Sequence, residues 1–170
     1  ENASYLENLL ADNQFFKLPN WGIMRIALDA MGGDFAPDNE VQGAVLAAES
    51  VSSKTDLEVI FVGREQDIRA SLSKIDSSKL HYSIVHADDI VGMGDEASTV
   101  VKKKRNSSLF KGIELHADGK ADGFVSTGNT GAVMSTATLV LGRVKGVSRP
   151  TIGSFFPTVN NRPALLVDAG

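Results

Sequence analysis

The chain of 170 residues contains no cysteine, which excludes disulfide bonds, thiolate metal sites and a cysteine nucleophile. Aromatic residues make up only 6% of it, and its formal net charge is −4. A negative balance argues against a nucleic-acid partner, because surfaces that bind nucleic acid are normally basic. No apolar run reaches the length of a membrane span, and the charged N-terminal residues do not resemble a secretory signal. We therefore expect a soluble, cytoplasmic protein.

The composition is that of a globular protein, with 42% hydrophobic and 22% charged residues. The length suits a single domain with a real core. Residues 1–23 differ from the rest, and we interpret them as an N-terminal extension, with the domain covering residues 24–170. A short helix in this extension would carry one apolar face, formed by Tyr5, Leu6, Leu9 and Leu10.

Predicted strands and helices alternate along the domain, which indicates an α/β fold with three layers: a mainly parallel sheet and helices on both faces. The strands are expected at residues 24–29, 57–62, 80–85, 123–125, 151–156 and 164–167. The helices are expected after Pro37, at residues 65–72, at 96–105 with Asp95 as the cap, from Ser107 or Ser108 to Gly119, and at 132–142. Because the last strand ends at the chain terminus, we expect the sheet to continue on the C-terminal side, beyond the residues given.

Four loops follow predicted strands and share small, hydroxyl, amide and carboxylate residues. In open parallel sheets, ligands bind beyond the carboxyl ends of the strands. We therefore predict that these loops converge on one ligand site. They are residues 29–34, 86–95, 126–131 and 168–170.

The loop at residues 126–131 lies between a short apolar strand and a mostly apolar helix. Its backbone N–H groups and hydroxyls can converge at the helix N-terminus, where unpaired donors and the helix dipole favour an anion. It has neither the Gly-Lys-Ser/Thr of a Walker A loop nor the G-x-G-x-x-G spacing of a dinucleotide site. A phosphate or carboxylate cradle and an ordinary glycine-rich turn both remain open. The residues of this candidate are Ser126, Thr127, Gly128, Asn129, Thr130 and Gly131.

A basic run occupies residues 102–105. Such a run is commonly a solvated helix face. In helical phase, however, Lys104 follows Ala97 by seven residues and falls near the apolar stripe, whereas Lys102 points almost opposite. We predict that Lys104 turns toward the ligand edge as a phosphate or oxyanion partner, while its neighbours attract an acidic protein.

Asp29 and Asp34 flank the glycine pair Gly32-Gly33. The two carboxylates could hold a positively charged group or orient a lysine. Alternatively, Asp34 only caps the turn before Pro37. His81 and His86 fall on opposite sides of a strand and make a poor metal pair, and no Ser-His-Asp order is evident, so we expect no metal site.

Several segments resemble, in the right order, the bacterial phosphate acyltransferase family known as PlsX. The similarity covers residues 24–170 and leaves out residues 1–23. It rests on Asp29-Ala30-Met31-Gly32-Gly33-Asp34 with Ala36-Pro37, Ile84-Val85-His86-Ala87, Lys103-Lys104-Arg105-Asn106-Ser107-Ser108, Val125 to Ala132, Arg149-Pro150 and Leu165 to Gly170.

The resemblance implies an enzyme that moves a fatty acyl group from acyl-carrier protein to inorganic phosphate, giving an acyl phosphate for phospholipid synthesis. It also implies a fold similar to that of isopropylmalate dehydrogenases and phosphotransacetylases, a homodimer, peripheral membrane contact and no cofactor. As hypotheses of our own, Lys104 or backbone N–H groups stabilise the oxyanion, Asn129 orients a reactant and Asp29 acts beside them. Substrate binding is assigned to Gly32, Gly33, Asp34, Ser126, Thr127, Gly128, Thr130, Gly131, Asp168 and Gly170.

Members of that family are considerably longer than this chain. The missing part is expected to hold the rest of the acyl site, the dimer surface and the membrane contacts, so the chain alone could be inactive. Two alternatives stay open. One is a phosphotransacetylase-like enzyme that uses acyl-coenzyme A, and the other is a non-catalytic regulator that binds acyl groups or anions.

Overall fold

The computed structural model describes residues 23–51, 56–159 and 163–168. The extension predicted for residues 1–23 therefore lies outside the described residues, apart from Ile23, and so does the candidate Gly170.

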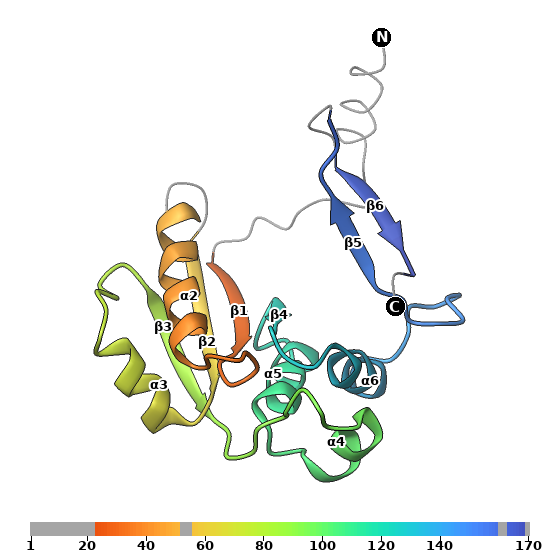
Figure 1. Cartoon of the computed structure of the whole chain (residues 1–170), viewed down its shortest axis with the longest axis horizontal. Helices are drawn as coiled ribbons and strands as arrows, with labels where there is room; N and C mark the ends of the chain where they lie inside the picture. Colours follow the sequence, from red (N-terminus) through yellow and green to blue (C-terminus); the bar gives the residue numbers. More distant parts are fainter. Residues whose placement is uncertain (1–22, 52–55, 160–162, 169–170) are drawn as a thin grey trace.

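A parallel sheet of four strands forms the centre of the domain, in the order β3-β2-β1-β4 (Figure 1). All three pairings are parallel, and the register places Asp29 opposite Val62 and Leu28 opposite Val125. The carboxyl ends of neighbouring strands consequently meet at one edge. The strands are β1 (Ile23–Asp29), β2 (Asp56–Gly63), β3 (His81–His86) and β4 (Gly123–Val125). Each lies within about one residue of its predicted position.

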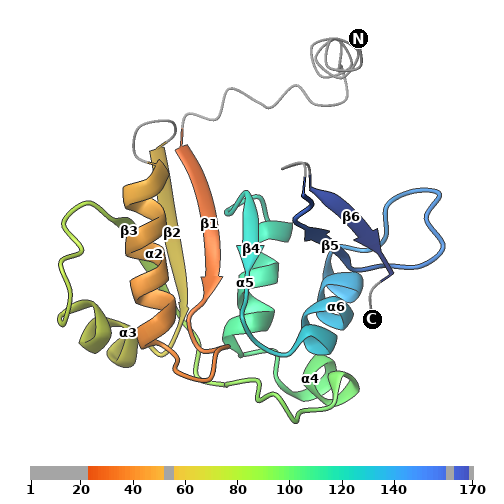
Figure 2. The ribbon, with the colours of Figure 1, turned by 45° about the horizontal axis from the view of Figure 1, so that its top comes forward.

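Helices cover both faces of this sheet, as predicted (Figure 2). On one face, α2 and α3 pack against Leu28, Val59 and Phe61. On the other face, α5 packs against β1, β2 and β4, and α4 and α6 extend this layer through a cluster around Val100. The helices are α2 (Asp38–Val51), α3 (Glu65–Leu72), α4 (Ala97–Lys103), α5 (Ser108–Ala117) and α6 (Thr130–Val140). None of the helices in the described ranges combines the length and the apolar character that crossing a bilayer requires.

Strands β5 (Gly153–Phe156) and β6 (Ala164–Val167) form a separate antiparallel pair. Both views show this pair to the right of β4, apart from the four-stranded sheet (Figures 1 and 2). The prediction that Asp168 ends a strand at the common ligand edge is therefore wrong in this structure. Strand β6 pairs with β5 instead, the Asp168 N–H donates to the Ile152 carbonyl, and its carboxylate accepts from the Thr151 hydroxyl.

The helix ends confirm one predicted cap and correct another. The Ser107 hydroxyl accepts from the Phe110 N–H and caps α5 as expected. Asp95 does not cap α4, because Glu96 occupies the N-cap position without a side-chain cap. The Asp95 carboxylate instead binds the Lys104 ammonium and the Gly92 N–H. A partner nine residues along the chain has replaced the local cap.

Candidate active site

The turn after β1 and the turn after β4 touch each other through their backbones. A Cβ added at Gly128 would lie 3.0 Å from the Gly32 carbonyl oxygen and 3.1 Å from the Gly32 Cα. A Cβ at Gly32 would lie 2.7 Å from Asp29 Oδ2 and 3.0 Å from the Gly128 nitrogen. Because real Cβ atoms rarely approach so closely, both positions require glycine if the turns are to keep this contact.

The carboxylate of Asp29 is hydrogen-bonded to both of these turns. Its side chain is 1% exposed. One carboxylate oxygen accepts from the Met31 N–H at 3.1 Å, and the other accepts from the Ser126 hydroxyl at 2.8 Å. The Ser126 oxygen in turn accepts from the Gly128 N–H at 3.1 Å. Since the only hydroxyl proton of Ser126 is donated to Asp29, this side chain has no donor left for an anion.

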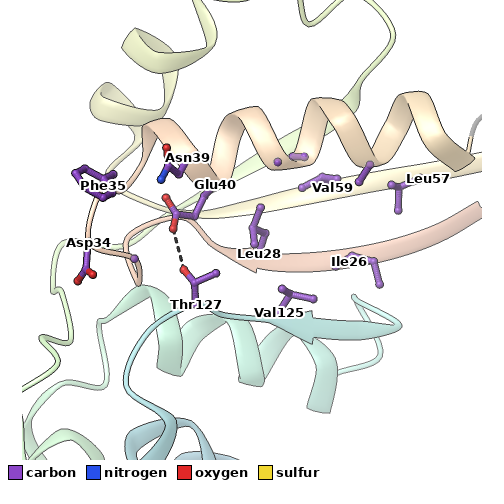
Figure 3. Close-up of a pocket in the computed structure, with 14 residues that line it drawn as sticks. Ile26, Leu28, Asp34, Phe35, Asn39, Glu40, Leu57, Val59, Val125 and Thr127 are labelled. Carbon is purple, nitrogen blue, oxygen red and sulfur yellow. Dashed lines mark hydrogen bonds between the residues drawn. The ribbon is translucent and has the colours of Figure 1, made fainter. Parts of the chain in front are cut away.

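A second acid–hydroxyl pair lies beside the first. Glu40, in the first turn of α2, is 6% exposed and accepts from the Thr127 hydroxyl at 2.8 Å (Figure 3). A Cβ at Gly33 would lie 2.1 Å from the same Glu40 oxygen, so this glycine makes room for the pair. The other carboxylate oxygen, Oε2, is buried without a hydrogen-bond partner among the described residues. Such an oxygen is costly to leave unsatisfied, which makes it a candidate ligand contact.

Asn129 begins α6 and connects it to the loop after β3. Its Oδ1 accepts from the Ala132 N–H at 2.9 Å, which is an N-cap. Its Nδ2 lies within hydrogen-bond distance of three carbonyl oxygens, those of Gly92, Met93 and Asp95, at 3.3, 3.1 and 3.0 Å. Both ends of the amide are thus engaged within the protein, so the geometry suits positioning better than contact with a reactant.

Lys104 reaches the same loop from the end of α4. Its ammonium donates to the Ile90 carbonyl at 2.7 Å and to Asp95 at 2.5 Å. The Lys104 ammonium, with the Gly92 N–H, holds the pKa of the Asp95 carboxyl below its ordinary value. Lys104 is partly buried, whereas Lys102 is exposed, which agrees with the predicted helical phase.

Two unpaired donors of the site lie in the first turn of α6. The Ala132 and Val133 N–H groups are bonded to Asn129, whereas those of Thr130 and Gly131 have no acceptor within the part of the chain that the structure describes. Both residues are exposed. Two free N–H groups at the positive end of a helix dipole form a simple anion site. The backbone, rather than the hydroxyls of Ser126 and Thr127, is available to bind the anion.

Residues 24–170 match the model of a family described as "Fatty acid synthesis protein". The chain belongs to this family. Among the curated relatives, the phosphate acyltransferase of Dictyoglomus turgidum is 42% identical over 147 residues, which cover 86% of this chain and 43% of the relative. That of Trichlorobacter lovleyi is 46% identical over 147 residues, which cover 86% and 41%. The chain therefore spans less than half the length of the curated relatives it matches.

A solved structure of another protein shares this fold. A phosphotransacetylase from Streptococcus pyogenes has a TM-score of 0.56 and 20% identity, covering 84% of this chain and 45% of the solved one. At this identity the likeness concerns the fold alone. The expected α/β architecture and the expected membership of the phosphate acyltransferase family are confirmed. Both curated relatives carry the name phosphate acyltransferase.

Three of the four predicted loops meet in this family member, and the fourth does not. Contacts link the loop of Gly32 to that of Gly128, and Asn129 links the latter to Gly92. Asp168 stays in the separate pair of strands. Asp29 is hydrogen-bonded to Met31 and Ser126 rather than to a lysine, and Asp34 does not cap the turn before Pro37. Its side chain is exposed, and that turn is closed by the Ala36 N–H donating to the Gly33 carbonyl.

Glu40 is the site residue that sequence reasoning missed. An acid in the first turn of a helix is ordinarily explained by the helix dipole alone. Its burial depends on Thr127, which is 87 residues away. The only sequence feature that pointed to Glu40 was Gly33, the second glycine of the pair. A glycine there indicates that another side chain packs closely against the turn.

Proposed function

We propose that this chain forms the phosphate-binding part of an enzyme that transfers a fatty acyl group from acyl-carrier protein to inorganic phosphate. The observation that carries the proposal is the pair of unpaired N–H groups at Thr130 and Gly131, held beside the interlocked glycine turns. Family membership supports the reaction class. The product would be an acyl phosphate for phospholipid synthesis.

In this mechanism the protein binds and orients the nucleophile. Phosphate is held at the N-terminus of α6, and one of its oxygens attacks the thioester carbonyl. The new C–O bond forms as the C–S bond breaks, and the departing thiolate takes up a proton. Backbone N–H groups, or the Lys104 ammonium after exchange of a partner, stabilise the negative charge that develops on the carbonyl oxygen.

The remaining residues act by positioning. The Asp29–Ser126 and Glu40–Thr127 pairs fix the turn, and Asn129 holds the loop of Asp95 against it. The exposed basic residues Lys102, Lys103 and Arg105 would attract an acidic carrier protein by electrostatic steering. We further propose that the whole protein works as a cytoplasmic homodimer with peripheral membrane contact.

The test compares two donors at saturating phosphate. The whole protein carrying this chain should show phosphate-dependent loss of palmitoyl-acyl-carrier protein with formation of acyl phosphate, and little loss of acetyl-coenzyme A. Preference for acetyl-coenzyme A would favour the phosphotransacetylase alternative. Binding of phosphate without turnover of either donor would favour a non-catalytic role.

A further inference from the structure

An apolar groove of about 530 Å³ lies on the face of the sheet beside α2 (Figure 3). Its volume is in the range of small-molecule sites. Its floor consists of side chains from β1, β2 and β4, and its wall consists of small residues of α2. No charged side chain lies along this part of the groove. The apolar lining is formed by Ile26, Leu28, Leu57, Val59, Val125, Ala44 and Ala47, with Gly43 beside them.

The polar residues of the groove are gathered at one end. They come from the same two turns as the candidate active site, together with the start of α2: Asp34, Asn39, Glu40 and Thr127. Gly33 and the exposed ring of Phe35 line this end as well. The groove therefore begins at the site and runs away from it along the sheet. Such a surface matches a ligand with one polar end and one long apolar end.

Glu40 supplies an independent indication of a ligand at the polar end. Its side chain is 6% exposed and lines the groove. One oxygen accepts from Thr127, while Oε2 is buried without a partner among the described residues. A carboxylate oxygen in this position requires a hydrogen-bond donor, which the aliphatic walls do not offer.

We propose that the groove binds the acyl chain of the thioester substrate, with the thioester at the end formed by Gly33 and Thr127. Glu40 Oε2 accepts a hydrogen bond from an amide N–H of the arm that carries the thioester. This inference rests on the proposed function and adds a location for the chain. It also assigns the preference for long acyl groups to α2 and to the sheet face.

Gly43 offers a direct test, because a Cβ there would meet no atom within 4 Å and the residue lies within α2. Gly43→Phe fills the groove, and replacing a helical glycine improves helix propensity, so the variant should fold. Ala47→Phe is a second blocking variant. Leu46→Phe is the matched control, since Leu46 is exposed on the same helix and does not line the groove.

Isothermal titration calorimetry on the whole protein that carries this chain would use dodecanoyl-pantetheine, acetyl-pantetheine and inorganic phosphate as separate probes, below the concentration at which the thioester aggregates. The wild type and Leu46→Phe should bind the dodecanoyl compound at least about tenfold more tightly than the acetyl one, a difference that burial of only about two methylene groups already supplies. Gly43→Phe and Ala47→Phe should abolish this difference and leave phosphate affinity unchanged.

Equal affinity for the two thioesters in the wild type, or an unchanged preference in both blocking variants, would overturn the inference. So would a concentration-dependent dimer that Gly43→Phe dissociates, because the groove would then bind a second copy. These outcomes are separate from the proposed function. If Gly43→Phe has no effect on acyl transfer to phosphate, the proposed function stands and the groove is not the acyl-chain site. If the protein binds thioesters according to chain length but transfers no acyl group, the groove stands and the proposed function fails.

Discussion

Gly32 and Gly128 lie so close together that a Cβ on Gly128 would come within 3.1 Å of the Gly32 Cα. This contact joins the end of β1 to the turn that opens α6, although the two residues are far apart in the chain. It places the glycine pair after the first strand beside the candidate anion site. The predictions below follow from this junction and from the side chains that surround it.

Gly128→Ala should separate the two turns. The added methyl would press on backbone atoms of Gly32, which cannot give way as the end of a side chain can, so we expect a loss of about 1–3 kcal/mol in the free energy of unfolding. Urea titration would measure it. Gly94→Ala is the control, because a Cβ at Gly94 meets nothing within 4 Å. Equal stability of the two variants would contradict the contact.

Glu40→Ala should destabilise the protein by about 1–3 kcal/mol, since it leaves the Thr127 hydroxyl without its acceptor and opens a space behind Gly33. Glu40→Gln keeps an oxygen that can accept from Thr127, and it should cost much less. Thermal unfolding of both variants tests the order. If Glu40→Gln were as damaging as Glu40→Ala, the hydrogen bond to Thr127 would not be the stabilising contact.

Asn129→Asp separates the two roles of the Asn129 side chain, which caps α6 and donates to the loop after β3. A carboxylate still accepts from the Ala132 N–H and caps α6, but it cannot donate to the carbonyls of Gly92, Met93 and Asp95. We expect faster amide hydrogen exchange in the loop at residues 92–95 with α6 unchanged. Asn129→Ala should affect both, and a loop equally protected in all three proteins would refute the assignment.

Lys104→Ala should reduce acyl transfer to phosphate far more than Lys102→Ala, because only Lys104 reaches the loop beside Asn129. Initial rates in the whole protein at saturating phosphate would compare them. Lys102 is exposed and serves as the control for simple loss of a positive charge. Matching rates for the two variants would remove Lys104 from the site.

The Asp95–Lys104 pair also predicts a pH dependence. The Lys104 ammonium and the Gly92 N–H lower the pKa of Asp95 in the folded protein. The carboxylate therefore contributes stability above its unfolded pKa of about 3.9, and this contribution is lost as the pH falls through the lower folded value. Carboxyl NMR titration should show the pKa of Asp95 rising in Lys104→Ala. An unchanged titration would mean that the ion pair does not form in solution.

Local patterns predicted the elements that build the sheet. The nearly continuous apolar run from Leu57 to Val62 could only be a strand buried on both faces, and residues 65–72 form the predicted helix. The glycine-rich turn before α6 was also predictable, since small residues between a strand and a helix leave N–H groups free.

The errors concern contacts that the local sequence pattern does not specify. The run at residues 164–167 has the composition of a strand, but nothing in it distinguishes a place in the parallel sheet from antiparallel pairing with β5. Asp95 has a suitable residue type for a cap, yet the charge of Lys104 attracts its carboxylate more strongly. Glu40 could not be recognised because its burial depends on the packing of Thr127.

The most direct test of the account is an amide NMR titration of the chain with inorganic phosphate. The resonances of Thr130 and Gly131 should shift most, with those of Gly32 and Gly128 following, because the anion binds to the free N–H groups at the start of α6. The account would be contradicted if phosphate shifted other resonances but not those of Thr130 and Gly131. A spectrum that phosphate leaves unchanged would contradict it as well.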